Sequence, residues 1–281
     1  MIAAAFEYTR AGSIEDALEA LADPEARAIA GGHSLVPMMK LRLARPSRLV
    51  DIGGLDFRGV TDDREELRIG ALTTYHELVS LDAALGLPDA LRECASSVGD
   101  LQVRNAGTVG GGIAHGDPAS DLAAGVLALE ARLRIRSTSG TRECPADEFF
   151  LGPFTTALEQ QELLTEILVP RPRLGEGSAY ASITDPASGY PLAGAAARIR
   201  VEAGRIVSCT VGLTGIGACP ARVSAVEAAV LGGDLPVARA VSGALVGRDL
   251  VDDDPYRRQL VAVTVTRALE TACARASGSH G

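Results

Sequence analysis

The stretch Arg27-Ala-Ile-Ala-Gly-Gly-His-Ser-Leu-Val-Pro-Met-Met-Lys40 decides how the rest of the chain is interpreted. Its apolar start predicts a strand over residues 28–30, and the chain then breaks at two glycines and resumes as a helix predicted over 35–43. Ser34 stands at the expected N-cap, and Pro37 suits the first turn, where a missing N–H costs nothing. Glycine lets the main chain approach a ligand, and free amides at a turn and a helix start bind anions. The stretch therefore predicts a phosphate-binding segment.

A second stretch of the same character is Val103-Arg-Asn-Ala-Gly-Thr-Val-Gly-Gly-Gly-Ile-Ala-His-Gly-Asp-Pro-Ala-Ser-Asp121. Its consecutive glycines would cost a strand or helix interior roughly 0.5–1 kcal/mol each relative to alanine. Close approach of the backbone to a bound group is the expected compensation. Asp117 and Pro118 then predict a helix start, with the acid as its cap. Two such loops indicate a long anionic ligand held at both ends, although two tight turns without a ligand remain the alternative for either loop alone.

Composition excludes several classes of protein. The chain has 281 residues, 47% of them hydrophobic, which is enough for one large domain or two modest ones. Its net charge of −9 argues against nucleic acid and anionic membranes as partners. The five cysteines include no C-x-x-C pair, so no zinc or iron–sulfur site is expected on this chain. Free thiols, no evident signal peptide and no apolar membrane span predict a cytoplasmic protein that is not integral to the membrane.

The order of the predicted elements indicates an α+β chain with two domains. Residues 1–174 are predicted to hold a helix from Ser13, strands over 48–52, 67–70, 133–135 and 162–169, and helices over 74–81, 88–98 and 122–129. A Pro- and Gly-rich linker is expected over 171–177. Residues 175–281 are predicted to form a smaller domain with an antiparallel hairpin, 195–201 with 205–213, and helices over 221–231, 236–246 and 256–274.

Neither glycine loop fits a known single-loop nucleotide motif. A Rossmann site needs G-x-G-x-x-G between a strand and a helix, and no P-loop is present. The similar stretch Gly215-Ile-Gly217 runs into Cys219-Pro220, which predicts a turn. The pattern therefore favours a dinucleotide scheme in which two subdomains each contribute one loop.

The same residues carry a family resemblance. The segments concerned are Ala30-Gly-Gly-His-Ser-Leu35, Val103-Arg-Asn, Thr108-Val-Gly-Gly111, Asp117-Pro-Ala-Ser-Asp-Leu122, Phe149-Phe150-Leu-Gly152, Gly217-Ala-Cys-Pro-Ala-Arg222, Leu231-Gly-Gly233 and Tyr256-Arg-Arg258. Together they resemble the flavin-binding medium subunit of molybdenum hydroxylases, a group that includes aerobic carbon monoxide dehydrogenase and the bacterial xanthine dehydrogenase type. The resemblance covers nearly the whole chain in the right order.

The resemblance implies a fold similar to the flavin domain of vanillyl-alcohol oxidase, with FAD between two subdomains split near residue 55. Main-chain N–H groups of two segments would hold the pyrophosphate and ribityl chain: Ala30, Gly31, Gly32, His33, Ser34 and Leu35, and Thr108, Gly110, Gly111 and Gly112. Other residues would line the cofactor, namely Val98, Val103, Gly107 and Ala114, with Leu164 near the adenine. Asp121 would accept a hydrogen bond from cofactor hydroxyls or adenine. Tyr190 is expected near the flavin ring, with an ordinary packed tyrosine as the alternative.

The resemblance also implies partners. A large subunit would carry molybdopterin and a small subunit 2Fe–2S clusters, in a dimer of heterotrimers. Electrons would pass from the clusters through FAD to a quinone, NAD or oxygen, and no catalytic or metal-binding residue is expected on this chain, because the redox chemistry belongs to the cofactor. His33 and His115 are accordingly expected to donate hydrogen bonds and not to act as bases. A stand-alone FAD-dependent oxidase or dehydrogenase and a flavin-free scaffold subunit remain alternatives.

Two departures from the family pattern stand out. Gly112 lies where the family usually has Asn or Ser, so one side-chain hydrogen bond to the cofactor is expected to be missing. Ser182 and Ala187 lie near positions where the family commonly has Lys and Arg, which predicts a lower positive charge near the flavin.

Overall fold

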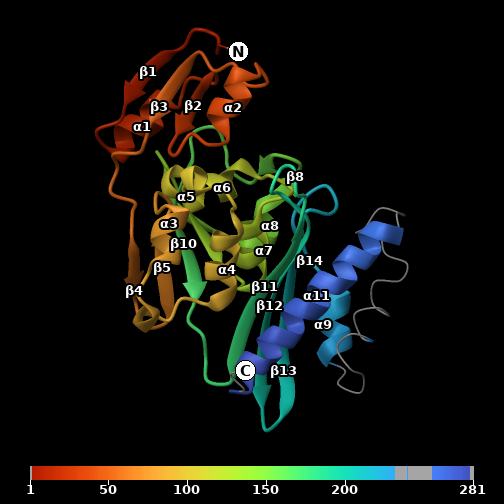
Figure 1. Cartoon of the computed structure of the whole chain (residues 1–281). Helices are drawn as coiled ribbons and strands as arrows, with labels where there is room; N and C mark the ends of the chain where they lie inside the picture. The colour runs from red at the N-terminus through yellow and green to blue at the C-terminus, as the bar shows by residue number, and fades with distance from the viewer. Residues whose placement is uncertain (1, 232–238, 240–254, 279–281) are drawn as a thin grey trace.

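The computed structural model describes residues 2–231, 239 and 255–278, and its strands form three main sheets, each built from its own part of the chain. Figure 1 shows the first sheet at one end of the molecule, the second in the middle and the third beside the C-terminal helix. The helix predicted over 236–246 lies outside the described residues apart from position 239. Among the described helices, none is both long enough and apolar enough to cross a membrane.

The first sheet is parallel and small. It contains β1 (Glu7–Arg10), β3 (Arg48–Asp51) and β2 (Ala26–Ile29), in that order. Helices α1 (Ile14–Ala20) and α2 (Leu35–Lys40) follow the first two strands. The predicted start of α1 is confirmed, because the Ser13 hydroxyl accepts a hydrogen bond from the Asp16 amide at 3.1 Å.

The second sheet is antiparallel and carries most of the helices. Its strands are β4 (Val60–Asp62), β5 (Glu66–Gly70), β10 (Leu163–Pro170), β6 (Arg132–Ser137) and β7 (Gly140–Pro145), in that order. The helices of this region are α3 (Tyr75–Val79), α4 (Asp89–Ser97), α5 (Leu101–Ala106), α6 (Val109–His115), α7 (Asp121–Ala128) and α8 (Ala146–Phe149), with a short hairpin of β8 (Phe150–Gly152) and β9 (Thr155–Thr156). Apolar residues of β5, β6 and β10 pack with these helices in one core.

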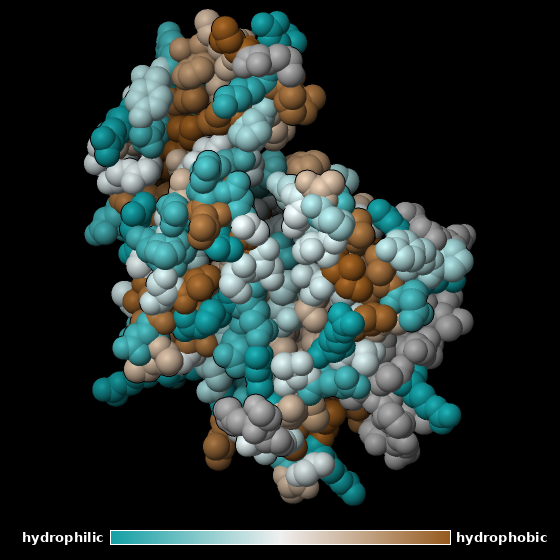
Figure 2. All heavy atoms as spheres, in the orientation of Figure 1, coloured by the Kyte–Doolittle hydropathy of each residue, from teal (hydrophilic) through white to brown (hydrophobic). Residues whose placement is uncertain are grey.

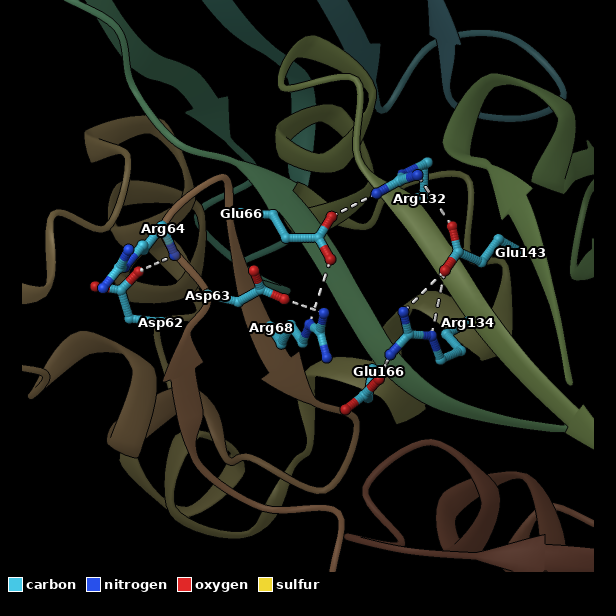
Figure 3. A network of polar contacts seen from close by, with 9 residues as sticks. All are labelled: Asp62, Asp63, Arg64, Glu66, Arg68, Arg132, Arg134, Glu143 and Glu166. Atoms are coloured by element: carbon cyan, nitrogen blue, oxygen red, sulfur yellow. Dashed lines mark hydrogen bonds and ion pairs between the residues drawn. The ribbon is translucent and has the colours of Figure 1, made fainter.

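The other face of the second sheet carries a ladder of ion pairs, which Figure 3 shows across the neighbouring strands. Arg134 pairs with Glu143 at 2.9 Å and also with Glu166, while Leu133 and Ile135 on either side of it are fully buried. This alternation has the period of two expected for a half-buried strand. Arg68 and Arg132 likewise each pair with two carboxylates. Each of these three arginines is therefore already paired with carboxylates.

The third sheet is antiparallel and contains β11 (Glu176–Thr184), β12 (Pro191–Glu202), β13 (Arg205–Thr214) and β14 (Ala221–Arg222). Helices α9 (Ser224–Leu231) and α11 (Pro255–Ala276) pack against it. Helices α4 and α7 of the middle region also contact its strands. The predicted hairpin is confirmed, with Ala203 and Gly204 both at positive φ in the tight turn between β12 and β13.

Several predicted boundaries are wrong. Strand β11 begins inside the predicted linker and was missed altogether, because Glu176-Gly-Ser-Ala-Tyr-Ala-Ser-Ile-Thr184 has too few large apolar residues to read as a strand. The helix predicted from residue 221 begins at Ser224, after strand β14. The helix predicted from Asp117 begins at Asp121, because the Asp117 carboxylate accepts the Ala119 amide at 2.9 Å and so closes a turn.

Candidate functional site

A cavity of about 940 Å³ lies between the first sheet and the helices of the second. Figure 2 shows the surface hollowed between the part of the molecule that holds β1–β3 and the rest. Its walls come from the turn after β2, from α5 and α6, from the chain leading into β10, and from the loop 187–190 between β11 and β12. The volume is at the upper end of the range of small-molecule and cofactor sites.

The two glycine segments meet at this cavity. A Cβ placed on Gly31 would lie 2.0 Å from the carbonyl oxygen of Ala106 and 2.8 Å from the Cα of Gly107. The main chains of the two segments are therefore in direct contact, and a side chain at position 31 has no room. The convergence expected from the sequence is present in the structure, while contact with a diphosphate stays a prediction.

The first segment presents unpaired amides. Within the described chain, none of the main-chain N–H groups of residues 31–35 donates a hydrogen bond, and Val36 is the first amide after them with an acceptor, the Gly32 carbonyl at 2.9 Å. Gly32 has φ of 71°, a conformation that glycine adopts without strain. Ser34 stands at the N-cap as predicted, but its side chain makes no capping bond. Successive free amides at a turn form a site for anionic oxygens.

The second segment is a helix and not the expected loop. Thr108 caps α6, and the amides of residues 109–112 donate to oxygens of Thr108, Thr73 and Ala71 at 2.8–3.1 Å. Each of these four amides thus already has an acceptor within the protein, and their contact with a cofactor stays a prediction. The Thr108 amide itself donates no hydrogen bond within the described residues.

The glycines of the second segment make room for the protein itself. A Cβ on Gly110 would lie 2.8 Å from the Cα of Ala71. A Cβ on Gly107 would lie 2.9 Å from the Tyr75 ring, and one on Gly112 would lie 2.1 Å from the Tyr75 hydroxyl. These glycines therefore allow close packing against Tyr75 of α3 and against Ala71, the residue after β5. Sequence reasoning missed Tyr75, although the capping box of Thr74 and Glu77 that fixes its helix was predicted correctly.

Asp121 is a buried carboxylate in the cavity wall. It lies at the start of α7, and the Tyr180 hydroxyl of β11 donates a hydrogen bond to its Oδ1 at 2.5 Å. Burial raises the pKa of Asp121 to about 6, and the Tyr180 bond opposes that rise. Tyr180 was not predicted as a site residue, because the strand that carries it was missed. Through this bond the C-terminal sheet reaches the site.

His115 and Tyr190 differ in how far they are buried in the cavity. His115 is half-buried against Phe154, with ring centroids 5.1 Å apart, and burial lowers its pKa, so it is neutral near pH 7. A neutral histidine fits the expected hydrogen-bonding role. Tyr190 is 55% exposed at the cavity mouth, beside Ala187, whereas Ser182 does not line the cavity.

Cationic side chains are scarce in this cavity. Arg27 is the one Arg or Lys among its lining residues in the described chain, and it already donates to the carbonyls of Pro24 and Ala26. Carboxylates are more numerous, including Asp121 and Glu162. No group of three or more His, Cys, Asp or Glu among the described residues is arranged to hold a metal ion.

Every residue predicted to bind the cofactor lines this one cavity. They are Ala30, Gly31, Gly32, His33, Ser34, Leu35, Val98, Val103, Gly107, Thr108, Gly110, Gly111, Gly112, Ala114, Asp121, Leu164 and Tyr190. Free amides for a diphosphate, a carboxylate for hydroxyl groups and apolar walls for flat rings fit a flavin dinucleotide. The individual contacts stay predictions.

Comparison with known proteins identifies the family. A model of the FAD binding domain in molybdopterin dehydrogenase matches residues 4–172. The carbon monoxide dehydrogenase medium chain of Afipia carboxidovorans is 35% identical, with 98% of this chain and 99% of that protein covered. The glyceraldehyde dehydrogenase medium chain of Sulfolobus acidocaldarius is also 35% identical, with 94% and 97% covered.

A solved structure agrees with these sequences. The structure of carbon monoxide dehydrogenase from Hydrogenophaga pseudoflava that lacks the Mo-pyranopterin moiety matches with a TM-score of 0.92 at 37% identity, covering 98% of this chain and 99% of the matched chain. The fold, the family model and the full-length relatives therefore agree. The chain belongs to the FAD-binding medium subunits of molybdenum hydroxylases and is a flavin-carrying electron-transfer subunit of this oxidoreductase family.

Proposed function

We propose that this chain binds one FAD in the cavity and passes electrons from the 2Fe–2S clusters of a small partner subunit to an external acceptor, a quinone, NAD or oxygen. A large partner subunit would hold the molybdopterin and oxidise the substrate. The observation that carries this proposal is the run of free amides at residues 31–35, held against the second glycine segment in a cavity of dinucleotide size. Bound FAD supplies the redox chemistry, and the protein binds, orients and shields it.

We assign the diphosphate of FAD to the first segment and the Thr108 amide. These main-chain donors have no acceptor within the described residues, and anionic oxygens favour such donors. The carboxylate of Asp121 then accepts hydrogen bonds from cofactor hydroxyls. Leu164, in an apolar part of the wall, contacts the adenine, and Tyr190 at the mouth lies beside the flavin ring. The other predicted residues complete the walls.

We assign the choice of substrate to the large subunit. Two relatives that are equally similar to this chain, at 35% identity, are named for carbon monoxide and for glyceraldehyde. Both are called medium chains, which supports a complex with a large and a small subunit, and we propose a dimer of such heterotrimers. The five free cysteines support a cytoplasmic location, where thiols stay reduced.

We also propose two domains, 1–174 and 175–281, with the first divided near residue 55. This division is supported by the sheets, whose strands fall within 7–51, 60–170 and 176–222.

Purification of the full chain, alone and co-expressed with its partners, tests the proposal. We expect one FAD per chain in the absorbance spectrum, and molybdenum and iron on the chains that co-purify. A native chain without stoichiometric FAD would refute flavin binding and favour a scaffold. Oxidation of an organic substrate by the chain alone would refute the subunit role and favour a stand-alone enzyme.

A further inference from the structure

Tyr75 is held rigidly beside the second glycine segment. It is the first residue of α3, directly after the Thr74 cap, and its amide donates to the Gly107 carbonyl at 3.1 Å. The edge of its ring lies where a side chain on Gly107 would lie, and its hydroxyl lies where a side chain on Gly112 would lie. The residue is only 8% exposed. The missing side chains of Gly107, just before α6, and Gly112, within α6, thus leave room for the Tyr75 ring and hydroxyl.

The hydroxyl of Tyr75 has no hydrogen-bond partner within the described chain, although the residue lines the cavity. Buried tyrosine hydroxyls usually have a partner, and a buried polar group without one is costly. Tyr180, which is partly buried and is not among the residues that line the cavity, does have one in Asp121. The Tyr75 hydroxyl is therefore available to a group bound in the cavity.

We propose that the Tyr75 hydroxyl donates a hydrogen bond to the flavin and ribityl half of bound FAD, in the place that a side chain at position 112 would otherwise take. This inference rests on the proposed FAD site. The hydrogen-bonding group thus comes from α3 and not from α6. Position 112 has to be glycine as a result, because a Cβ there would lie 2.1 Å from the Tyr75 hydroxyl.

The surroundings of Tyr75 support a donor role for its hydroxyl and the choice of the flavin half of the cofactor. Burial is the main cause that raises the pKa of Tyr75, and the charges of Asp121 and Asp117 add to it, so the hydroxyl stays protonated and donates. Asp121, Asp117 and Tyr190 line the same cavity and lie near enough to Tyr75 for their charges to raise its pKa. Tyr190 is the residue assigned to the flavin ring.

Tyr75→Phe in the full chain tests the bond, because it removes one oxygen and keeps the ring. We expect FAD to bind about 2- to 12-fold more weakly, the range of a net neutral hydrogen bond, as measured by flavin fluorescence during titration of the apoprotein. The inhibition constant of ADP, which lacks the flavin half, should stay within twofold. The melting temperature of the apoprotein should not fall, since the hydroxyl bonds no protein group among the described residues. Tyr8→Phe, on β1 and outside the cavity, is the matched control and should leave FAD affinity unchanged.

A second pair of variants tests the shared position. In Gly112→Ser alone, the new side chain clashes with the Tyr75 hydroxyl, and we therefore expect weaker FAD binding than in wild type. In Tyr75→Phe the next atom of the ring, Cζ, lies 3.3 Å from the same Cβ position, so serine fits there. The double variant Tyr75→Phe with Gly112→Ser should recover at least half of the lost affinity on a logarithmic scale.

The outcomes separate the two proposals. If the wild-type chain binds no FAD, the proposed function is refuted first. If the wild type binds FAD and Tyr75→Phe binds it equally well, only the Tyr75 bond is refuted. If Tyr75→Phe weakens ADP binding as much as FAD binding, the assignment of the bond to the flavin half is wrong. If the double variant binds FAD no more tightly than Tyr75→Phe, the proposal that Tyr75 takes the place of a side chain at position 112 is wrong.

Discussion

Gly31→Ala should uncouple the two glycine segments, and its effect can be worked out from the structure. The added methyl would lie 2.0 Å from the Ala106 oxygen, whereas ordinary contacts of a Cβ begin at 3.4 Å. The main chains must therefore separate by about 1.4 Å, and both are backbone that no rotamer change can move. Overpacking of this kind destabilises a protein by about 1–3 kcal/mol.

The same displacement should weaken FAD binding. The free amides of residues 31–35 can face a diphosphate only while the segment keeps its place. Loss of one hydrogen bond to a charged group costs about 1.5–3 kcal/mol, which corresponds to about 10- to 150-fold in the dissociation constant. Titration of the apoprotein with FAD measures this effect, and urea unfolding without FAD measures the stability loss separately.

Gly99→Ala is the matched control for this variant. Gly99 also lines the cavity, but nothing lies within 4 Å of a Cβ placed on it. We expect its FAD affinity to stay within twofold of wild type. Equal affinities for Gly31→Ala and Gly99→Ala, with both proteins folded, would refute the view that the contact between the two segments shapes the diphosphate site.

The remaining predictions concern charge. FAD affinity should rise with pH through about 6 and level off above 7, because a hydrogen bond from the cofactor favours the ionised form of Asp121, whose pKa without ligand is about 6. The variant Asp121→Asn should show no pH dependence over this range. If its pH profile equals that of wild type, Asp121 does not accept a bond from the cofactor. Without FAD, the raised pKa stabilises the fold at pH 4 and this contribution, on the order of 3 kcal/mol, is lost as pH rises through 6, so the unfolding free energy of wild type relative to Asp121→Asn should fall over that range. Tyr180→Phe removes the bond that lowers the Asp121 pKa, and the midpoint of the FAD affinity profile should move to higher pH; a midpoint at or below the wild-type value counts against the pair. Raising KCl from 50 to 500 mM should change FAD affinity by less than about threefold, because Arg27 is occupied and no other Arg or Lys of the described chain lines the cavity; a tenfold loss would point to a cationic contact.

The residues that line the cavity were predicted from the sequence, but the contacts that require glycine at positions 110–112 were not. Paired glycines after a strand correctly indicated free amides at residues 31–35. The glycines of 110–112 looked equivalent, but they lie in a capped helix whose amides are already bonded. A glycine run signals only that something comes close, and the sequence does not say whether that is a ligand or another part of the chain. At Gly112 it is Tyr75, which is remote in sequence and is found only from the packing of α3.

Tyr190, between β11 and β12, was predicted near the flavin, but the bond from the C-terminal sheet to Asp121 was not predicted from the sequence. Helix α7 is buried at every position, which a helix on the surface of one domain would not be. Its N-terminal residue, Asp121, lines the cavity, and its length packs against β12 and β13. Tyr180 closes the connection by bonding Asp121 from β11. A displacement of this sheet therefore has to change the hydrogen bonding, and with it the pKa, of a carboxylate in the cavity, so the C-terminal sheet helps to set the charge at the site.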